Sequence, residues 1–177
     1  FFVAGAIYSG VSAVVMILFL IRTSMLHMKY FIREEHFDAL GKLMLIFSFP
    51  WAYFYFNEYL LAWYGGDLSD WYVWNAITRG PYAWLWFIML ICNILIPWLT
   101  LWNKKVRRTP WLMFAIGLVI NLGMYTERYL IVPLMIARNR FPFAWDEYMP
   151  RIELVISVGS LCLFLLLYVL ASRLVPL

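Results

Sequence analysis

Three ionisable residues, Glu58, Glu127 and Arg128, lie inside strongly apolar stretches and could carry proton chemistry. A charged side chain at the centre of a membrane helix costs roughly 2.5–3.5 kcal/mol, so such residues are rare there and usually functional. One arginine can neutralise one carboxylate. The other carboxylate is then unpaired, protonated or in contact with water, a combination that is typical of a proton relay.

Two structural interpretations remain open for the same three residues. Glu58 or Glu127 can form a buried ion pair with Arg128 that only fixes the register of two helices. Alternatively, the long side chain of Arg128 can extend to the outer water interface and take no part in any chemistry.

The two carboxylates are expected to lie at similar depth. Glu58 follows Lys42 by sixteen residues, and Glu127 follows Trp111 by sixteen residues. At roughly 1.5 Å of rise per residue, each carboxylate lies about 24 Å from the start of its helix. Both helices are predicted to run outward from the cytoplasm, which places both carboxylates in the outer half of a membrane.

Further polar residues accompany these carboxylates. Asn121, Tyr125 and Arg128 share one helix face, and the sequence predicts a polar stripe that points inward. Glu127 lies about 100° from Arg128 around the helix and is expected to face a different neighbour. The predicted proton path comprises six residues: Glu58, Glu127, Arg128, Tyr125, Asn121 and Asn57. For Asn121, as for Asn93, an interhelical hydrogen bond is the alternative interpretation.

The remaining residue types exclude several other chemistries. His27 and His36 lie in a loop, so no histidine pair can ligate a haem inside the membrane. Cys92 and Cys162 fall singly in apolar stretches, and no CxxCH or cysteine cluster is present. The nucleotide-binding and hydrolase motifs GxxxxGK, GxGxxG, HExxH and GxSxG are also missing. We therefore expect no metal or cofactor on this chain, and no nucleic acid partner.

The composition predicts the elements that must position these residues. Hydrophobic residues make up 65% of the 177 residues and charged residues only 14%, which is typical of an all-α integral membrane protein. About five transmembrane helices are expected, each long enough to cross a hydrocarbon core about 30 Å thick. They span residues 1–21, 41–64, 81–102, 110–136 and 152–171. We expect residues 1–151 to form a four-helix bundle and residues 152–177 to add one flanking helix.

Local signals refine these boundaries. Segment 22–40 is predicted to be a solvated connector. Segment 67–80 is predicted to lie in the interface between membrane and water. Pro97 frees the carbonyl of Asn93 and should kink the third span. Thr109 is predicted to cap the fourth span through its hydroxyl, with Pro110 as the first helical residue.

The basic residues predict an orientation. Nine of them fall in the first and third loops or after the fifth span, namely Arg22, Lys29, Arg33, Lys42, Lys104, Lys105, Arg107, Arg108 and Arg173. The opposite side holds Arg79, Arg138, Arg140 and Arg151. The positive-inside rule places the first group and the C-terminus in the cytoplasm. The amino end then lies outside, and we expect this sequence to be the C-terminal part of a longer chain.

Four segments carry a resemblance to a known family. They are HFDALGKLM at 36–44, WAYFYFNEYLLAWYG at 51–65, GPYAW at 80–84 and NLGMYTERY at 121–129. Together they resemble the NrfD/polysulfide reductase membrane subunits, and most closely the quinol-oxidising membrane subunit of alternative complex III. The resemblance covers nearly the whole sequence, which corresponds to the second helix bundle of that subunit.

The resemblance implies a membrane subunit of a quinol:electron-acceptor oxidoreductase in the bacterial cytoplasmic membrane. Quinol or menaquinol would be the substrate of the complex, and iron–sulfur clusters and c-type haem would reside in partner subunits. The implied partners are a periplasmic iron–sulfur subunit, c-type cytochrome subunits, a homologous membrane subunit and the lipid bilayer. The family's quinol pocket lies mainly in an N-terminal bundle outside this sequence, so we predict no quinol-binding residue. Buried acidic and basic residues serve such bundles as a proposed proton path, which Glu58, Glu127 and Arg128 match.

Two other functions remain open. The chain can be a structural membrane anchor of a respiratory complex with no chemistry of its own. It can also be a secondary transporter, although the sequence has no inverted repeat and no matching pair of glycine-broken helices.

Overall fold

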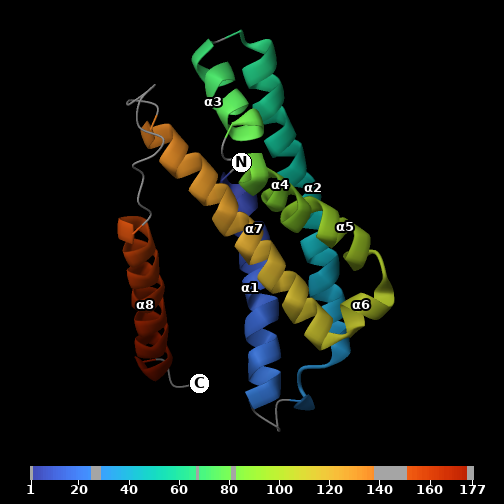
Figure 1. Ribbon diagram of the computed structural model, residues 1–177. Helices are drawn as coiled ribbons and strands as arrows, with labels where there is room; N and C mark the ends of the chain where they lie inside the picture. Colours follow the sequence, from blue (N-terminus) through green and yellow to red (C-terminus); the bar gives the residue numbers. More distant parts are fainter. Residues whose placement is uncertain (1, 25–28, 67, 81–82, 138–150, 175–177) are drawn as a thin grey trace. The chain divides into compact units, whose positions relative to one another are not determined.

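The computed structural model describes residues 2–24, 29–66, 68–80, 83–137 and 151–174, and every regular element within these ranges is helical (Figure 1). In chain order the elements are α1 (Phe2–Ser24), α2 (Glu34–Tyr64), α3 (Leu68–Arg79), α4 (Ala83–Leu90), the π-helix η2 (Ile91–Leu95), α5 (Ile96–Leu101), α6 (Lys104–Arg108), α7 (Pro110–Ala137) and α8 (Arg151–Leu174). The chain separates into two compact units, Phe1–Ile136 and Ala137–Leu177. The predicted all-α class is confirmed.

Among the residues that the structure describes, three helical stretches are long and apolar enough to cross a membrane. They are α1, α2 and the continuous stretch Ala83–Leu101 that joins α4, η2 and α5. Their outer faces expose large apolar side chains, as Ile46, Leu61 and Leu99 illustrate with exposed fractions of 58%, 69% and 72%. Such faces suit contact with lipid better than contact with water. The predicted total of about five spans stays a prediction.

Helix α2 begins earlier than the sequence suggested. The connector was predicted to continue to residue 40, but the helix begins at Glu34 and has 31 residues. The backbone N–H of Arg33 donates to Nδ1 of His36 over 3.1 Å and closes the first turn. Glu34 and Glu35 add negative charge at the helix N-terminus, which the helix dipole favours. The prediction for 34–40 was wrong because these polar residues stabilise a helix start.

The predicted disturbance at Pro97 takes the form of a π turn. Pro97 has no N–H to donate, and the backbone N–H of Ile96 bonds to the carbonyl of Ile91, five residues back. The carbonyl of Asn93 accepts a hydrogen bond of 3.2 Å from the hydroxyl of Tyr8 on α1. The carbonyl of Asn93 is therefore satisfied by another helix, and the predicted kink at Pro97 stays a prediction.

Two segments between the predicted spans contain short helices. The segment 67–80 contains α3, and the basic loop before α7 contains α6. Helix α7 begins at Pro110 as predicted. The hydroxyl of Thr109 instead donates backward to the carbonyl of Lys105, and the carbonyl of Thr109 accepts from the N–H of Met113. The start of α7 was predicted correctly, and the capping role of the Thr109 hydroxyl was wrong.

An ion cluster joins α2 to α6. Oδ1 of Asp38 accepts from Nε of Arg107 over 2.8 Å, and its Oδ2 lies 2.9 Å from Nζ of Lys42. Nη1 of Arg107 also donates to the carbonyls of Leu101 and Trp102, which end α5. One guanidinium therefore ties the start of α2 to the end of α5.

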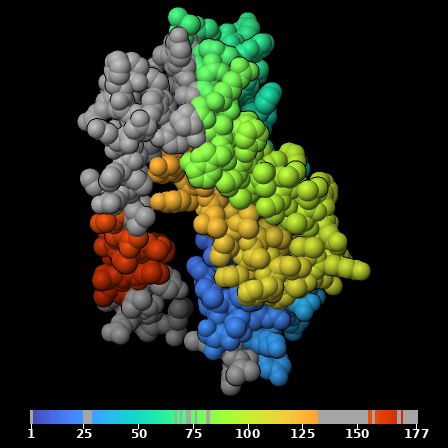
Figure 2. Space-filling view, viewed as in Figure 1, coloured from blue at the N-terminus to red at the C-terminus, as the bar shows by residue number. Residues whose placement is uncertain are grey.

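On the face shown in Figure 2, α7 lies beside the run from α4 to α6. Helix α7 also packs on α1, where the ring of Phe19 lies 5.7 Å from that of Trp111 and 4.8 Å from that of Phe114. In the second unit, the described side chains from Leu161 to Leu167 on α8 are all exposed.

Candidate functional site

The buried carboxylate of Glu127 is the centre of the candidate site. Its side chain on α7 is 0% exposed. The indole Nε1–H of Trp51 on α2 donates to its Oε2 over 3.0 Å. Its Oε1 lies 3.8 Å from Nη1 of Arg128 and has no hydrogen-bond partner. The separation exceeds a hydrogen-bond length, so Arg128 attracts the carboxylate without donating to it.

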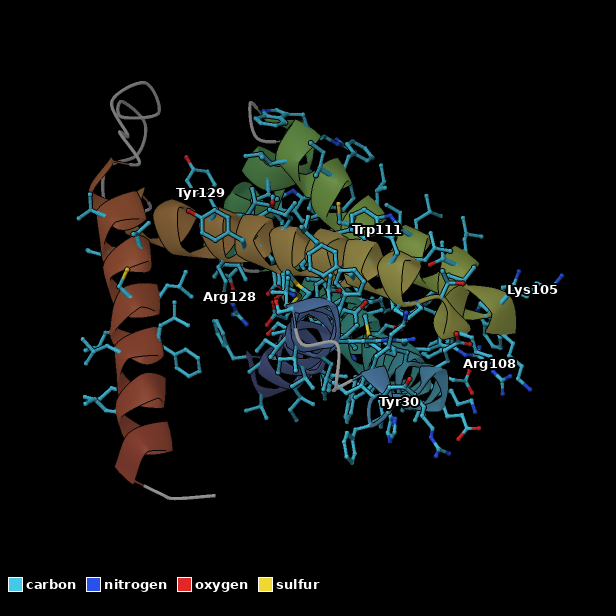
Figure 3. The ribbon with its side chains drawn as sticks, turned by 90° about the horizontal axis from the view of Figure 1, so that it is seen from below. Tyr30, Lys105, Arg108, Trp111, Arg128 and Tyr129 are labelled. Atoms are coloured by element: carbon cyan, nitrogen blue, oxygen red, sulfur yellow. The ribbon has the colours of Figure 1, made fainter. Side chains whose placement is uncertain are left out.

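Helix α1 covers the arginine side of this pair. The guanidinium of Arg128 lies 4.3 Å from the centre of the Phe2 ring, within range of a cation–π interaction. Gly5 leaves room for it, because a Cβ at that position would lie 3.0 Å from Nη2 of Arg128. Figure 3 shows Arg128 and its neighbour Tyr129 pointing to different sides of α7. The arginine is therefore held by α1 while Glu127 is held by α2.

Aromatic side chains extend the site along α2. The ring of Tyr55 stacks on that of Trp51 with centroids 5.5 Å apart and an angle of 13°. The hydroxyl of Tyr55 accepts from Nε1 of Trp86 on α4 over 2.8 Å. Trp74 of α3 lies edge-on to Tyr55 at 5.6 Å. Two further elements, α3 and α4, therefore fix the ring of Tyr55 that stacks on the indole of Trp51.

The side chains of Asn121 and Asn93 differ in their hydrogen bonding. Nδ2 of Asn121 donates to the hydroxyl of Ser12 over 2.7 Å, which is the interhelical contact that the sequence offered as an alternative. Asn93 is 0% exposed, and neither Oδ1 nor Nδ2 of its side chain has a hydrogen-bond partner. Its Oδ1 would lie 2.5 Å from a Cβ at Gly123, so only glycine fits there. The side-chain amide of Asn93 thus packs directly against the backbone of α7 at Gly123.

The other predicted residues lie further out. Glu58 is exposed and Asn57 is half-buried, both on α2. Glu127 meets α2 at Trp51, seven residues before Glu58, which corresponds to about 10 Å along the helix. The similar depth expected for the two carboxylates stays a prediction.

The inward face of α7 also differs from the predicted stripe. Tyr125 is 51% exposed, so its predicted inward orientation is wrong. The buried face is set by residues at helical spacing, namely Met113, Ile116, Ile120, Met124, Glu127 and Leu130. Asn121 and Arg128 lie at the edge of this face and reach α1 from there. Glu127 is thus the inward residue, and Arg128 flanks it.

Sequence reasoning missed several residues of the site and its surroundings. No role was predicted for Trp51 or Tyr8, yet both side chains are 0% exposed. Trp51 donates to Glu127 on α7, and Tyr8 donates to the carbonyl of Asn93 in η2. Their positions in the middle of apolar helices, away from the water interface where such residues gather, were an available signal. Asp38 was predicted to lie in a loop, although Lys42 four positions later indicates an ion pair between successive turns of a helix.

The described part of the chain contains no group of three or more His, Cys, Asp or Glu side chains that could hold a metal ion. Cys92 is a half-buried free thiol and Cys162 an exposed one. No protein-family model and no curated protein matches the chain. The resemblance to the NrfD family therefore stays a prediction.

Proposed function

We propose that this chain is a membrane subunit of a quinol:electron-acceptor oxidoreductase of the alternative complex III type, and that Glu127 carries protons within it. The observation that carries the proposal is the environment of the Glu127 carboxylate. Glu127 is fully buried, its Oε1 has no hydrogen-bond partner, and Arg128 lies 3.8 Å away. A buried carboxyl with one oxygen held and one oxygen without a partner can take up and release a proton at that second oxygen.

The membrane part of the proposal is supported by the three apolar helical stretches. In this proposal α7 and α8 complete five spans in a bacterial cytoplasmic membrane. The end of the first unit that carries Arg22, Lys29, Arg107 and Arg108 faces the cytoplasm, because positive residues are retained on that side. Quinol, the iron–sulfur clusters and c-type haem belong to the complex and its other subunits.

A path to Glu127 can be drawn along α2. Glu58 is exposed and lies one helical turn beyond Tyr55. The ring of Tyr55 stacks on Trp51, whose indole N–H donates to Glu127. Glu58 would collect the proton, and Oε1 of Glu127 would hold it next to the positive charge of Arg128. Water would carry the proton from Glu58 to Glu127, because an indole N–H is a donor only and relays no proton. Tyr55 and Trp51 flank this route in place of Tyr125, Asn121 and Asn57.

A structural anchor is the second candidate function, and one observation favours it. Both charged groups are held on a second helix, Glu127 by Trp51 on α2 and Arg128 by Phe2 on α1. Such contacts fix the register of three helices whether or not protons move. Substitution of Glu127 would then lower the yield of assembled complex and leave the activity of the assembled fraction unchanged.

The experiment that tests the oxidoreductase proposal is purification from native membranes in mild detergent. Mass spectrometry would identify the chains that copurify, and a redox difference spectrum would detect haem. We expect an iron–sulfur protein and c-type haem chains to accompany this subunit. A chain that purifies alone and colourless would contradict the proposal, and a liposome uptake assay would then test the transporter alternative.

A further inference from the structure

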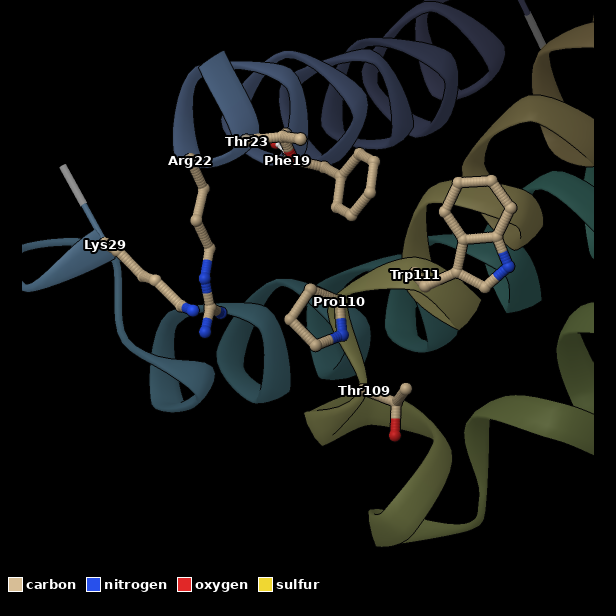
Figure 4. A pocket seen from close by; sticks show the side chains of 7 residues that line it. All are labelled: Phe19, Arg22, Thr23, Lys29, Thr109, Pro110 and Trp111. Carbon is tan, nitrogen blue, oxygen red and sulfur yellow. Dashed lines mark hydrogen bonds between the residues drawn. The ribbon is translucent and has the colours of Figure 1, made fainter. Parts of the chain in front are cut away.

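A pocket of about 390 Å³ lies at the end of the first unit that carries the basic loops (Figure 4). It is bounded by the last turn of α1, by the segment before α2 and by the start of α7. Seven residues line it: Phe19, Arg22, Thr23, Lys29, Thr109, Pro110 and Trp111. It lies apart from Glu127 and plays no part in the proton path proposed above.

The charge of this pocket is positive. Figure 4 shows the amino group of Lys29 beside the guanidinium of Arg22. Nη1 of Arg22 is buried and has no hydrogen-bond partner. None of the seven described lining residues is acidic, and the nearby carboxylate of Asp38 is already engaged by Lys42 and Arg107. Two cations that converge without a counterion favour an anionic ligand.

The start of α7 adds to this preference. The first backbone N–H groups of a helix have no partner within the helix, and its N-terminus attracts phosphate groups. Thr109 and Pro110 place this N-terminus on the pocket wall opposite Arg22. The hydroxyls of Thr23 and Thr109 donate to the backbone carbonyls of Phe19 and Lys105, so the donors left for a ligand are the two cations and the first N–H groups of α7. The polar side of the pocket is thus suited to phosphate oxygens.

The other side of the pocket is apolar. Phe19, Pro110 and Trp111 form it, and the rings of Phe19 and Trp111 lie 5.7 Å apart. Trp111 is 63% exposed at the start of an apolar helix, as is typical of a tryptophan at a membrane interface. A free phosphate ion would leave this wall in water, whereas the glycerol and upper acyl carbons of a lipid would cover it.

We propose that this pocket binds the phosphate headgroup of an anionic phospholipid, with Arg22 and Lys29 on the phosphate and with Phe19 and Trp111 against the glycerol backbone. This inference rests on the membrane part of the proposed function and is independent of its electron-transfer part. Basic pockets on the cytoplasmic side of membrane helices are a recurrent way to hold such headgroups.

Native mass spectrometry of the full chain in detergent, titrated with phosphatidylglycerol, tests the proposal. We expect one tightly retained lipid, and affinity about thirtyfold lower when Arg22→Gln and Lys29→Gln are combined, because both charges on the phosphate are lost. The matched control is Lys104→Gln with Lys105→Gln, which removes two exposed charges from α6 and should leave binding unchanged. Lys29→Glu, a change at an exposed position, gives the same test should the double variant fail to fold.

Three outcomes would overturn the proposal. Equal binding by Lys29→Glu and the unchanged chain would show that the pocket holds no headgroup. An equal loss in the Lys104/Lys105 control would indicate diffuse attraction to the basic surface. Competition by millimolar inorganic phosphate that matches phosphatidylglycerol would identify the ligand as free phosphate. Release of the chain from membranes by alkaline carbonate would instead contradict the membrane proposal itself.

Discussion

The indole N–H of Trp51 donates to Oε2 of Glu127 over 3.0 Å, and so it separates the two oxygens of one buried carboxylate into different environments. Oε2 is held by α2, while Oε1 has no hydrogen-bond partner and lies 3.8 Å from Arg128. This asymmetry decides which changes at the site should affect proton transfer and which should affect stability alone.

Glu127→Gln should slow proton-coupled turnover of the assembled complex by about a hundredfold, because the amide cannot carry a proton between partners. Glu58→Gln should slow it less, since Glu58 is exposed and water can replace it. The measurement is quinol-dependent electron transfer with simultaneous recording of external pH. Glu35→Gln, an exposed carboxylate in the first turn of α2, is the control. Unchanged turnover in both Glu127→Gln and Glu58→Gln would refute the proton path.

Trp51→Phe should destabilise the helical unit by about 2 kcal/mol, because a buried carboxylate loses its indole donor. Thermal unfolding in detergent measures the effect. Trp63→Phe on the same helix is the matched control, since Trp63 is 61% exposed. An equal effect of the two substitutions would mean that the hydrogen bond to Glu127 contributes nothing to stability.

Tyr8→Phe should cost about 1 kcal/mol, because the carbonyl of Asn93 loses its donor from α1. The loss should shrink when Pro97→Ala is present, since the alanine N–H can then bond to that carbonyl within the helix. A double-mutant cycle on thermal unfolding checks this coupling. Tyr30→Phe, at a position that is 85% exposed, controls for loss of a hydroxyl. Strict additivity of the two changes would contradict the assigned role of Pro97.

Asp38→Asn should destabilise the contact between α2 and α6 by about 2 kcal/mol, because it weakens two charged interactions at once. The same change frees Arg107, which also holds the last carbonyls of α5. Protection of the α5 and α6 amides against hydrogen exchange should therefore fall together with thermal stability. Glu34→Gln, which removes an exposed charge one turn earlier, should leave both quantities nearly unchanged.

The helical class and most helix boundaries could be predicted because apolar stretches of about twenty residues leave the backbone no alternative in lipid. Helix α1 and the start of α7 at Pro110 follow the sequence closely. The start of α2 could not be predicted in this way, since Glu34 and His36 are polar residues that serve loops and helix starts alike. Their role depends on one local hydrogen bond, from Arg33 to His36.

The orientation of α7 was harder to predict, for a different reason. In a chain that is apolar on all sides, hydrophobicity does not distinguish the packed face from the outer face. The polar residues Tyr125 and Arg128 therefore suggested the packed face, but Ile120 and Glu127, both 0% exposed, lie in it, while Tyr125 is exposed. The partner of Glu127 is separated from it by 76 residues, a tertiary contact that no local spacing encodes.

The π turn at Ile91–Leu95 has a consequence for the spacing of the two tryptophans on either side of it. Trp86 donates to Tyr55 and Trp98 donates to Ser48, so both indoles reach the same helix. Twelve positions of regular α-helix would turn them about 120° apart, whereas one residue absorbed by the π turn brings them to within about 20°. Deletion of a single residue from this turn would restore a regular helix and leave both indoles facing α2, whereas deletion of a residue elsewhere between the two tryptophans would rotate one indole by about 100°. A one-residue gap at this turn would therefore mark the loss of the π turn with both contacts to α2 preserved.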